Sequence, residues 1–470
     1  MPNLTFSMRW AEIAKFGLTA LRYSDTRFRS FNRGDSGREG AGQNMKKQQQ
    51  HEVWSFFSGG MGLDLGFETA GLPPTMAVEI DNKCCTTIRT QRPDLSLIED
   101  SVCGMDADVL RRTRNYSGDV FLMIGGPPCQ SFSSGGKRAA LSDPRGNLIY
   151  EYMRLIGEVR PRFFLLENVA NLVTAALRHR KIEDRPGQHW NLKAYGEGKF
   201  NNIVSDVKPL EEDEQSGTAV RQILKDFDLL GYRVVLGVVN AADYGAPQNR
   251  LRFVLMGSRD NEQLSLPKPT HGFSTGMKPF RTVRNAIEDL VNNPGLHSEY
   301  TEQVATYFRH IPEGGNWRNL PEHLKREAMG ASYDAGGGKT GFYRRLAWDA
   351  PAPTITGKAN RKATATCHPA VTRPLSVKEC ARLQGFPDNW QFSGSMAPQY
   401  LQIGNAVPVH LGFAVARVFN RAAEKLQTSS SSWAFDTEKM LENAVKRLRA
   451  SACNKKSSAK SMPLFEETAA

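Results

Sequence analysis

Short apolar runs recur along the chain from residue 51, and each ends in a loop of Gly, Pro, Asn or Asp. They are Val53–Phe57, Met76–Ile80, Val120–Ile124, Phe163–Leu166, Arg233–Val239 and Phe253–Met256. Helix-like stretches lie between several of them, as at Leu148–Val159 and Ala219–Leu230. Buried strands that alternate with helices predict an α/β fold with a doubly wound, largely parallel sheet. Such sheets bind ligands at the carboxyl ends of their strands, so the residues just after these runs are the functional candidates.

The same pattern divides the chain into five parts. Strands and helices alternate in residues 51–260. The alternation is lost from residue 261, where Pro, Gly, His and Arg become more frequent, and this segment is predicted to be a second domain. The predicted parts are a basic extension (1–50), a catalytic and cofactor-binding domain (51–260), the second domain (261–350), a return to the first domain (351–427) and a tail (428–470). The return ends in a helix at about Val409–Gln427, and the tail holds a short amphipathic helix at about Asp436–Arg449 before an end expected to be disordered. Residues 175–217 are polar and predict a surface insertion, and a start at Met45 is an alternative reading of the extension.

Charge makes a polyanionic partner a candidate. The 470 residues carry 61 Lys+Arg against 49 Asp+Glu, a formal charge of +12. Basic side chains release counterions when they meet phosphates, which favours nucleic acid. A merely basic soluble protein explains the charge equally well, so charge alone does not decide.

Cysteine usage and apolar content restrict the cellular setting. The seven cysteines form no Cys-x-x-Cys pair, which argues against a disulfide framework or a zinc cluster. No apolar stretch is long enough to span a membrane, and the N-terminus lacks the apolar core of a signal peptide. The sequence therefore predicts a soluble intracellular protein with no metal centre and no membrane partner.

A glycine-rich loop follows the first apolar run. Gly59 and Gly62 lie in Phe57-Ser58-Gly59-Gly60-Met61-Gly62-Leu63-Asp64, where the backbone can approach a ligand closely before a helix begins. The next run ends in Glu79-Ile80-Asp81, and Asp100 takes a third such position; carboxylates there can bind ribose hydroxyls. Together they indicate an adenosine-containing cofactor. The alternatives are another nucleotide site or a tight turn for the loop, and helix caps for the acids.

Two further strand ends carry residues suited to covalent and acid–base chemistry. Cys129 lies in Gly125-Gly126-Pro127-Pro128-Cys129-Gln130-Ser131-Phe132-Ser133, a rigid loop where a thiol can act as a nucleophile if its pKa is lowered. Glu167 directly follows the run at Phe163–Leu166, where partial desolvation would raise its pKa towards the range useful for proton transfer. A lone cysteine is more often a small buried apolar residue, and a glutamate at this place can simply begin a helix.

Taken together, these motifs resemble the DNA cytosine-5 methyltransferase family over residues 52–425. Further matches follow in the family's order: Asp143-Pro144-Arg145-Gly146-Asn147-Leu148, Gln248-Asn249-Arg250-Leu251-Arg252, Arg373-Pro374-Leu375 with Glu379-Cys380-Ala381-Arg382-Leu383-Gln384-Gly385-Phe386-Pro387, and Gln402-Ile403-Gly404-Asn405-Ala406-Val407-Pro408. So many ordered motifs make a chance agreement negligible.

The resemblance implies a role for each matching residue. Cys129 matches the nucleophile, Glu167 the acid that contacts cytosine N3, and Arg252 the arginine that faces the base and the thiol. Cofactor-binding positions for S-adenosylmethionine fall on Phe57, Gly59, Gly62, Glu79, Asp100, Leu148 and Asn405. One departure is Met61, which stands where relatives commonly carry glycine and puts the local loop geometry in doubt.

The resemblance also implies a Rossmann-like methyltransferase domain with a smaller, irregular target-recognition domain at residues 261–350. Its candidate base readers are Asn316, Trp317 and Arg318, together with Lys339-Thr340-Gly341, although turn-forming or phosphate-contact roles suit the same residues. The preceding Ile311-Pro312-Glu313-Gly314-Gly315 is similar to recognition domains of enzymes acting on short, GC-flanked palindromes.

The expected partner is double-stranded DNA. The sequence leaves open whether the enzyme acts alone or is paired with a cognate restriction endonuclease acting on the same sequence. The protein is expected to be a monomer in the bacterial cytoplasm, associated with the nucleoid through DNA binding. Two rival functions remain. An RNA cytosine methyltransferase of the same superfamily would have a shorter recognition segment, and a non-catalytic DNA-binding protein would have no reason to keep Cys129, Glu167 and Arg252 together.

Overall fold

A computed structural model describes residues 51–128, 148–178, 210–333, 341–358, 364–424 and 436–457. Structural statements refer to these residues. No helix among them is long and apolar enough to cross a membrane.

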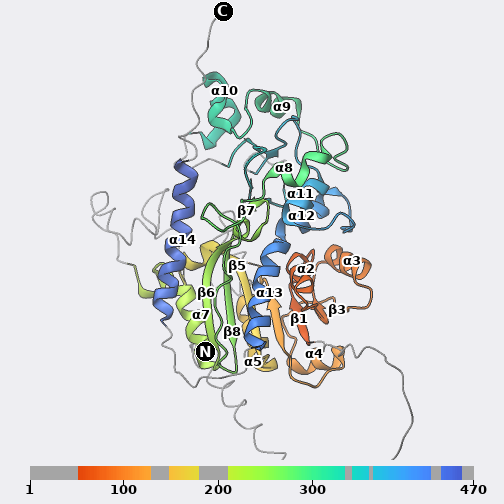
Figure 1. Ribbon diagram of the computed structural model, residues 1–470, viewed down its shortest axis with the longest axis vertical. Coiled ribbons are helices and arrows are strands. Elements are labelled where there is room, and N and C mark those ends of the chain that lie inside the picture. The colour runs from red at the N-terminus through yellow and green to blue at the C-terminus, as the bar shows by residue number, and fades with distance from the viewer. Residues whose placement is uncertain are drawn as a thin grey trace, which may run out of the picture.

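A seven-stranded sheet forms the centre of the molecule (Figure 1). Its strands are β1 (Val53–Phe56), β2 (Met76–Val78), β3 (Ser96–Ile98), β4 (Leu122–Gly125), β5 (Phe163–Val169), β6 (Arg233–Asn240) and β8 (Leu251–Ser258), in the order β3-β2-β1-β4-β5-β8-β6. β8 is antiparallel to both of its neighbours, and the other pairs are parallel. The predicted doubly wound, largely parallel α/β fold is confirmed. β3 was not predicted as a strand, because its three residues are only partly buried and give no clear apolar run.

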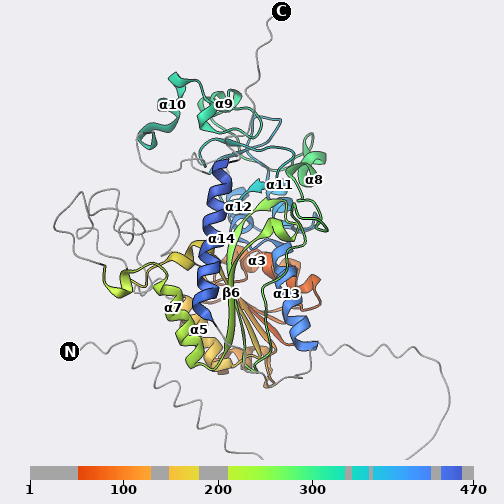
Figure 2. The ribbon, with the colours of Figure 1, turned by 60° about the vertical axis from the view of Figure 1, so that its left-hand side comes forward.

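Helices cover both faces of the sheet because alternate strand residues point to opposite sides. Phe164 and Leu166 of β5 join one apolar core, while Phe163 and Leu165 join the other. The covering helices are α2 (Gly62–Thr69), α3 (Asn82–Gln91), α4 (Ala107–Arg114), α5 (Leu148–Val159), α7 (Thr218–Leu229), α13 (Val409–Glu424) and α14 (Thr437–Ser457). α5, α7 and α14 contribute to the first core, and α2 and α13 to the second. In Figure 2, α5, α7 and α14 lie on one side of the sheet and α13 on the other. α14 continues eight residues past its predicted end.

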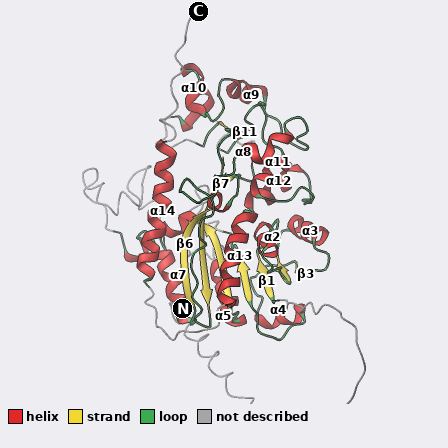
Figure 3. Ribbon diagram, viewed as in Figure 1, coloured by secondary structure: helices red, strands yellow, loops and turns green. Residues whose placement is uncertain are grey.

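Residues 261–406, here called the cap region, lie above the carboxyl edge of the sheet and consist largely of loops and short helices (Figure 3). The elements are α8 (Val283–Ile287), α9 (Glu302–Arg309), α10 (Glu322–Met329), α11 (Val377–Gln384) and α12 (Met396–Asn405), with the two-residue strands β9 (Arg344–Arg345), β10 (Ala352–Pro353) and β11 (Thr366–Cys367). β10 pairs with β7 (Gln248–Asn249), and β11 with β9.

Two smaller apolar cores hold the cap region. One joins Tyr307 and Phe308 of α9 to Cys367, which lies beyond the expected domain end at residue 350. The other joins α8, α11 and α12 to Met61 and Leu65 of the first domain. The cap region is thus packed onto the loop that precedes α2, and the domain boundaries themselves stay predictions.

Candidate active site

A cleft of about 1450 Å³ opens at the carboxyl edge of the sheet. Its floor is formed by the ends of β1, β2, β4 and β5 and by the start of β8. Cap-region residues 354–358, 396–398, 400–402 and 404–406 form the opposite wall. All of the predicted site residues within the described chain line this one cleft: Phe57, Gly59, Gly62, Glu79, Asp100, Leu148, Glu167, Arg252 and Asn405. Cys129 lies outside the described residues, but Pro127 and Pro128, which lead to it, line the same cleft.

The first loop has positive φ at three positions, the first of which is Phe57 with φ 56°. Gly59 has φ +54°, and Met61 has φ 64°, a left-handed conformation that costs an L-residue roughly 1–2 kcal/mol. The doubt raised by Met61 therefore has a physical answer: methionine adopts the glycine-like conformation while its side chain is buried in the cap-region core. Gly62 has another reason to be glycine, because a Cβ there would collide with the carbonyl oxygen of Val407.

Glu79 is held in place by three backbone N–H groups. Its Oε2 accepts from Gly59 at 2.8 Å, and its Oε1 accepts from Ile80 at 2.9 Å and from Asp81 at 2.8 Å. The carboxylate is thus fixed against the glycine loop with lone pairs left for a ligand. Asp81 instead accepts from Lys83 and Cys84 as the N-cap of α3, so the helix-cap alternative describes that acid. Asp100 is exposed at the cleft and accepts from Ser101 at 2.6 Å.

Asp64 is a fourth acid at this end of the cleft, and sequence reasoning did not single it out. It is 1% exposed, lines the cleft, and neither carboxylate oxygen has a hydrogen-bond partner among the described residues. Burial raises the pKa of Asp64 to about 6, although the nearby Ser55 hydroxyl acts to lower this pKa. The only sequence signal was its place in the first turn of a helix that begins at the glycine loop.

Glu167 and Arg252 form a buried ion pair on adjacent strands. Because β5 and β8 are antiparallel, with Val169 opposite Arg252, Glu167 and Arg252 lie two positions apart across the pair, and Arg252 Nε is 2.7 Å from Glu167 Oε1. Burial raises the pKa of Glu167 although Arg252 and Arg250 oppose the shift, and burial lowers the pKa of Arg252 against the effect of Glu167. A Cβ at Gly126 would lie 3.0 Å from Glu167 Oε2, so the strand-end glycine leaves room for the carboxylate.

Asn168 connects this pair to the loop that leads to Cys129. Its Nδ2 donates to the Pro127 carbonyl at 3.0 Å, and its Oδ1 accepts from the Val169 N–H at 2.9 Å. Asn168 is 3% exposed. The residue after the acid therefore fixes the backbone two positions before the predicted nucleophile.

Arg250, two residues before Arg252, has a different task that its motif did not reveal. Its guanidinium donates to the carbonyls of Ile355 at 2.8 Å, Gly404 at 2.8 Å and Ala406 at 2.9 Å. Gln248 adds contacts to Leu383 and Gln384. These two residues tie the cap region to the sheet and set the width of the cleft.

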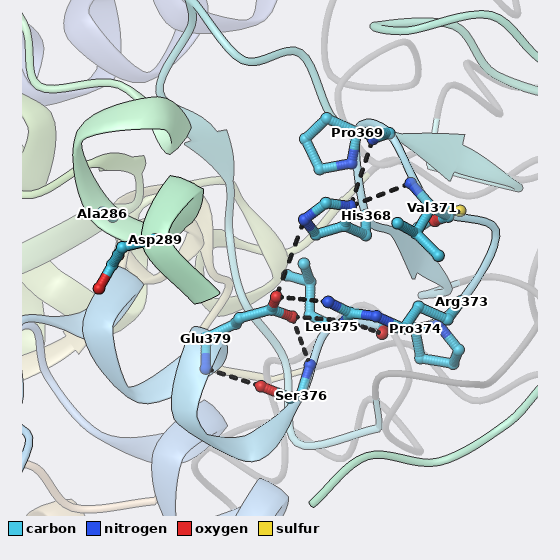
Figure 4. A network of polar contacts seen from close by, with 12 residues as sticks. Ala286, Asp289, His368, Pro369, Val371, Arg373, Pro374, Leu375, Ser376 and Glu379 are labelled. Atoms are coloured by element: carbon cyan, nitrogen blue, oxygen red, sulfur yellow. Dashed lines mark hydrogen bonds and ion pairs between the residues drawn. The ribbon is translucent and has the colours of Figure 1, made fainter. Parts of the chain in front are cut away.

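The motif around Arg373 and Glu379 is also structural (Figure 4). Arg373 donates to both Glu379 oxygens at 2.8 and 2.7 Å, and Ser376 and Glu379 form a capping box at the start of α11. His368 Nε2 lies 3.8 Å from Glu379 Oε1, and burial lowers the pKa of His368 to about 4. The network is fully enclosed by protein and lies outside the cleft lining, so it positions the wall of the cleft rather than the chemistry.

The candidate base readers are only partly described. Asn316 caps the 3₁₀ turn η6 (Trp317–Asn319) by accepting from Arg318 at 3.1 Å, which favours the turn-forming reading for that residue. The Arg318 guanidinium lies 5.7 Å from the Trp317 ring centre, and Arg318 is exposed. Lys339 and Thr340 lie outside the described residues. Base reading by any of them stays a prediction.

The chain is similar to known methyltransferases in sequence and in fold. The family model for C-5 cytosine-specific DNA methylases matches residues 51–183 and 207–421, leaving a gap inside the predicted insertion. The type II methyltransferase M.PspPI of Psychrobacter sp. (strain TA137) is 33% identical over 380 residues, covering 80% of each chain. M.Sau96I of Staphylococcus aureus is 34% identical and covers 78% of this chain and 75% of its own. In fold, the chain is similar to a solved structure from E. coli, described as that of a DNA modification methyltransferase encoded within a prophage, with a TM-score of 0.52 at 24% identity, over 80% of this chain and all of the other.

Proposed function

Since the chain belongs to the C-5 cytosine-specific DNA methylase family, we propose that it transfers a methyl group from S-adenosylmethionine to C5 of a cytosine flipped out of a short specific DNA sequence. The observation that carries the proposal is the single cleft in which a glycine loop with a fixed glutamate adjoins the Glu167–Arg252 pair. Cys129 is the proposed nucleophile.

The β1–β3 end of the cleft suits the cofactor. Glu79 keeps acceptor capacity for ribose hydroxyls, Asp100 is accessible beside it, and Ile80 is 68% exposed and offers an apolar face for a purine ring. Gly59 allows close backbone approach, and Asn405 and Leu148 line the same space. When bound, S-adenosylmethionine supplies an electrophilic sulfonium methyl group.

The β4–β5–β8 end of the cleft suits the base. Cytosine C5 is a weak nucleophile until a thiolate adds at C6, so Cys129 would form the S–C6 bond and push the electron pair onto C5. Glu167, with its raised pKa, would share a proton with N3 and ease that addition. Arg252 would offset negative charge near O2 and the thiolate. After methyl transfer a base removes the C5 proton, and the S–C6 bond breaks by β-elimination to free Cys129.

We also infer a place in a restriction–modification system, with a cognate endonuclease that cuts the same sequence, because the relatives are type II methyltransferases. Double-stranded DNA is preferred over RNA as substrate because the predicted target-recognition domain, residues 261–350, offers about ninety residues for target recognition. We expect a monomer.

A mechanism-based trap tests the proposal. A DNA duplex library carrying 5-fluorocytosine blocks removal of the group at C5, so the protein and cofactor should give a covalent adduct through Cys129. The Cys129→Ser variant should bind duplex DNA but give neither adduct nor methylated product. An adduct-free wild-type reaction, or full methylation by Cys129→Ser, would refute the assignment. Bisulfite sequencing of DNA from expressing cells would then identify the target sequence.

A further inference from the structure

One buried acid of the cleft has no part in the chemistry proposed above. Asp64 lies in the first turn of α2, is 1% exposed and lines the cleft. Neither of its carboxylate oxygens has a hydrogen-bond partner among the described residues. The Ser55 hydroxyl is near it but is hydrogen-bonded to Ser58 Oγ at 2.9 Å. A buried charge without a partner costs stability, so stability does not explain why an acid occupies this position.

Close packing holds α2 in place around Asp64. A Cβ on Gly62 would collide with the carbonyl oxygen of Val407, and a Cβ on Gly66 would collide with that of Val409. The backbone of α2 therefore lies directly against the chain that enters α13. Because the helix cannot shift towards water, the carboxylate stays enclosed at the edge of the cleft.

The start of the helix explains an acid here only in part. A carboxylate in the first turn interacts favourably with the helix dipole, and α2 begins after Met61 with no side-chain cap. That interaction does not require burial, since a surface acid provides it as well. Burial outweighs it at Asp64, whose pKa is about 6 rather than the ordinary 3.8. The dipole therefore does not account for an enclosed carboxylate.

The charged groups that raise the pKa of Asp64 are themselves acids. They are Glu68, one turn further along α2, and Glu79, which is fixed after β2. Glu68 is paired with Arg92 at 2.8 Å, which offsets its charge. Glu79 and Asp64 remain as two buried carboxylates that line the same end of the cleft. A cation bound there would be attracted by both.

We propose that Asp64 makes the cleft select the cationic methyl donor over the product, because its carboxylate attracts the sulfonium of S-adenosylmethionine but not the neutral thioether of S-adenosylhomocysteine. The inference rests on the proposed function for the identity of the cofactor. Both ligands carry the same amino and carboxylate groups, so the effects of those groups cancel in the ratio of the two affinities. An enclosed charge acts without touching the ligand, since little water screens it. Transfer of the methyl group removes the positive charge, so the product is held less tightly than the donor.

The test measures the dissociation constants of both ligands by isothermal titration calorimetry on the full chain without DNA. Asp64→Asn keeps the shape of the side chain and removes its charge. It should weaken binding of S-adenosylmethionine on the order of ten- to a hundredfold, and that of S-adenosylhomocysteine by about twofold or less. Sinefungin, which carries a protonated amine in place of the sulfonium methyl group, should follow S-adenosylmethionine.

Asp81→Asn is the matched control. Asp81 lines the same cleft but is exposed, and asparagine can still cap α3. Water and salt screen an exposed charge, so this variant should bind both ligands as the wild type does. In the wild type, the preference for S-adenosylmethionine should also grow from about pH 5 to about pH 8 as Asp64 ionises, whereas the preference of Asp64→Asn should stay constant.

Wild-type affinities in Asp64→Asn, or equal weakening of the two ligands, would overturn the inference while leaving the proposed function intact. The same loss of preference in Asp81→Asn would also overturn it, since the general acidity of the cleft would then select the donor. An altered preference in Asp64→Asn, in a chain whose wild type forms no adduct with 5-fluorocytosine DNA, would have the opposite meaning. The role of Asp64 would stand, and the catalytic assignment would fall.

Discussion

The sheet and the cap region bury their residues in different ways. In the sheet, Phe163 to Leu166 are all 0% exposed and belong to the two large apolar cores. In the cap region, buried arginines hold loops together: Arg345 donates to the carbonyls of Phe308 at 2.7 Å, Ile311 at 2.8 Å and His368 at 3.1 Å. Apolar burial is non-directional, whereas each guanidinium requires particular carbonyls in particular places. The buried arginines therefore add direction-specific contacts to the two apolar cores of the cap region.

Arg250 and Arg252 show both uses of a buried charge within three residues. Both arginines line the cleft, but Arg252 pairs with a carboxylate there, while Arg250 donates to carbonyls of the cap region. A single motif thus contains one residue that we propose for the chemistry and one that holds the two regions together.

The largest effect on the rate of methylation should come from a change at Glu167, which lines the cleft. Glu167→Gln keeps the shape of the side chain but cannot supply a proton, so we expect kcat to fall about 10²–10⁴-fold. Because burial raises the pKa of Glu167, the wild-type rate should also decline as the pH rises through that pKa, and the variant should lack this decline. Single-turnover methylation of duplex DNA across pH measures both. A variant with wild-type rates would remove Glu167 from the chemistry.

A change at Arg250, which holds the cap region, should lower the free energy of unfolding more than the rate of methylation. Arg250→Met leaves three buried carbonyls without their donor, so we expect the free energy of unfolding to fall by about 3–5 kcal/mol. The matched Arg252→Met change should cost less stability, because its partner faces the cleft and water, but should reduce methylation strongly. Chemical denaturation and single-turnover rates on both variants separate the two roles. Equal stability losses would show that the comparison between the two arginines is wrong.

The two regions were also unequally predictable from sequence. The strands of the sheet could be predicted because they are apolar runs followed by loops. α5 was predicted with its observed bounds at Leu148 and Val159. In the cap region, the partners of Arg345 lie about 23 to 37 residues away in the chain and are backbone atoms, which leave no trace in residue type. The same holds for Arg250, whose acceptors are more than a hundred residues distant.

The functional site was also only partly predictable from the sequence. Strand-end positions brought Glu79 and Glu167 to one cleft as expected, since parallel strands end at one edge. Arg252, which the family resemblance identified, reaches the same cleft from the start of β8. The antiparallel insertion of β8, which sets Arg252 beside Glu167, could not be predicted from apolar runs, because they carry no direction. Asp64 escaped notice because nothing in its local sequence indicates that its carboxylate is buried without a partner.

Asp64 gives the smallest and most pH-dependent prediction, and it concerns the sheet side. Its pKa is about 6 in the folded chain against an ordinary value of 3.8, so the folded state binds the proton more tightly than the unfolded state. The stability contributed by the protonated form is therefore complete below pH 3.8 and is lost as the pH rises through 6. Asp64→Asn cannot ionise, so above pH 6 the cofactor-free variant should exceed the wild type by roughly 1–3 kcal/mol in free energy of unfolding. The two curves should converge near pH 4. Urea denaturation at several pH values provides the measurement, and a constant difference at every pH would mean that Asp64 ionises freely in the fold. In that case the Asp64 carboxylate would be stabilised by a partner in the fold, as the buried arginines of the cap region are by carbonyl groups.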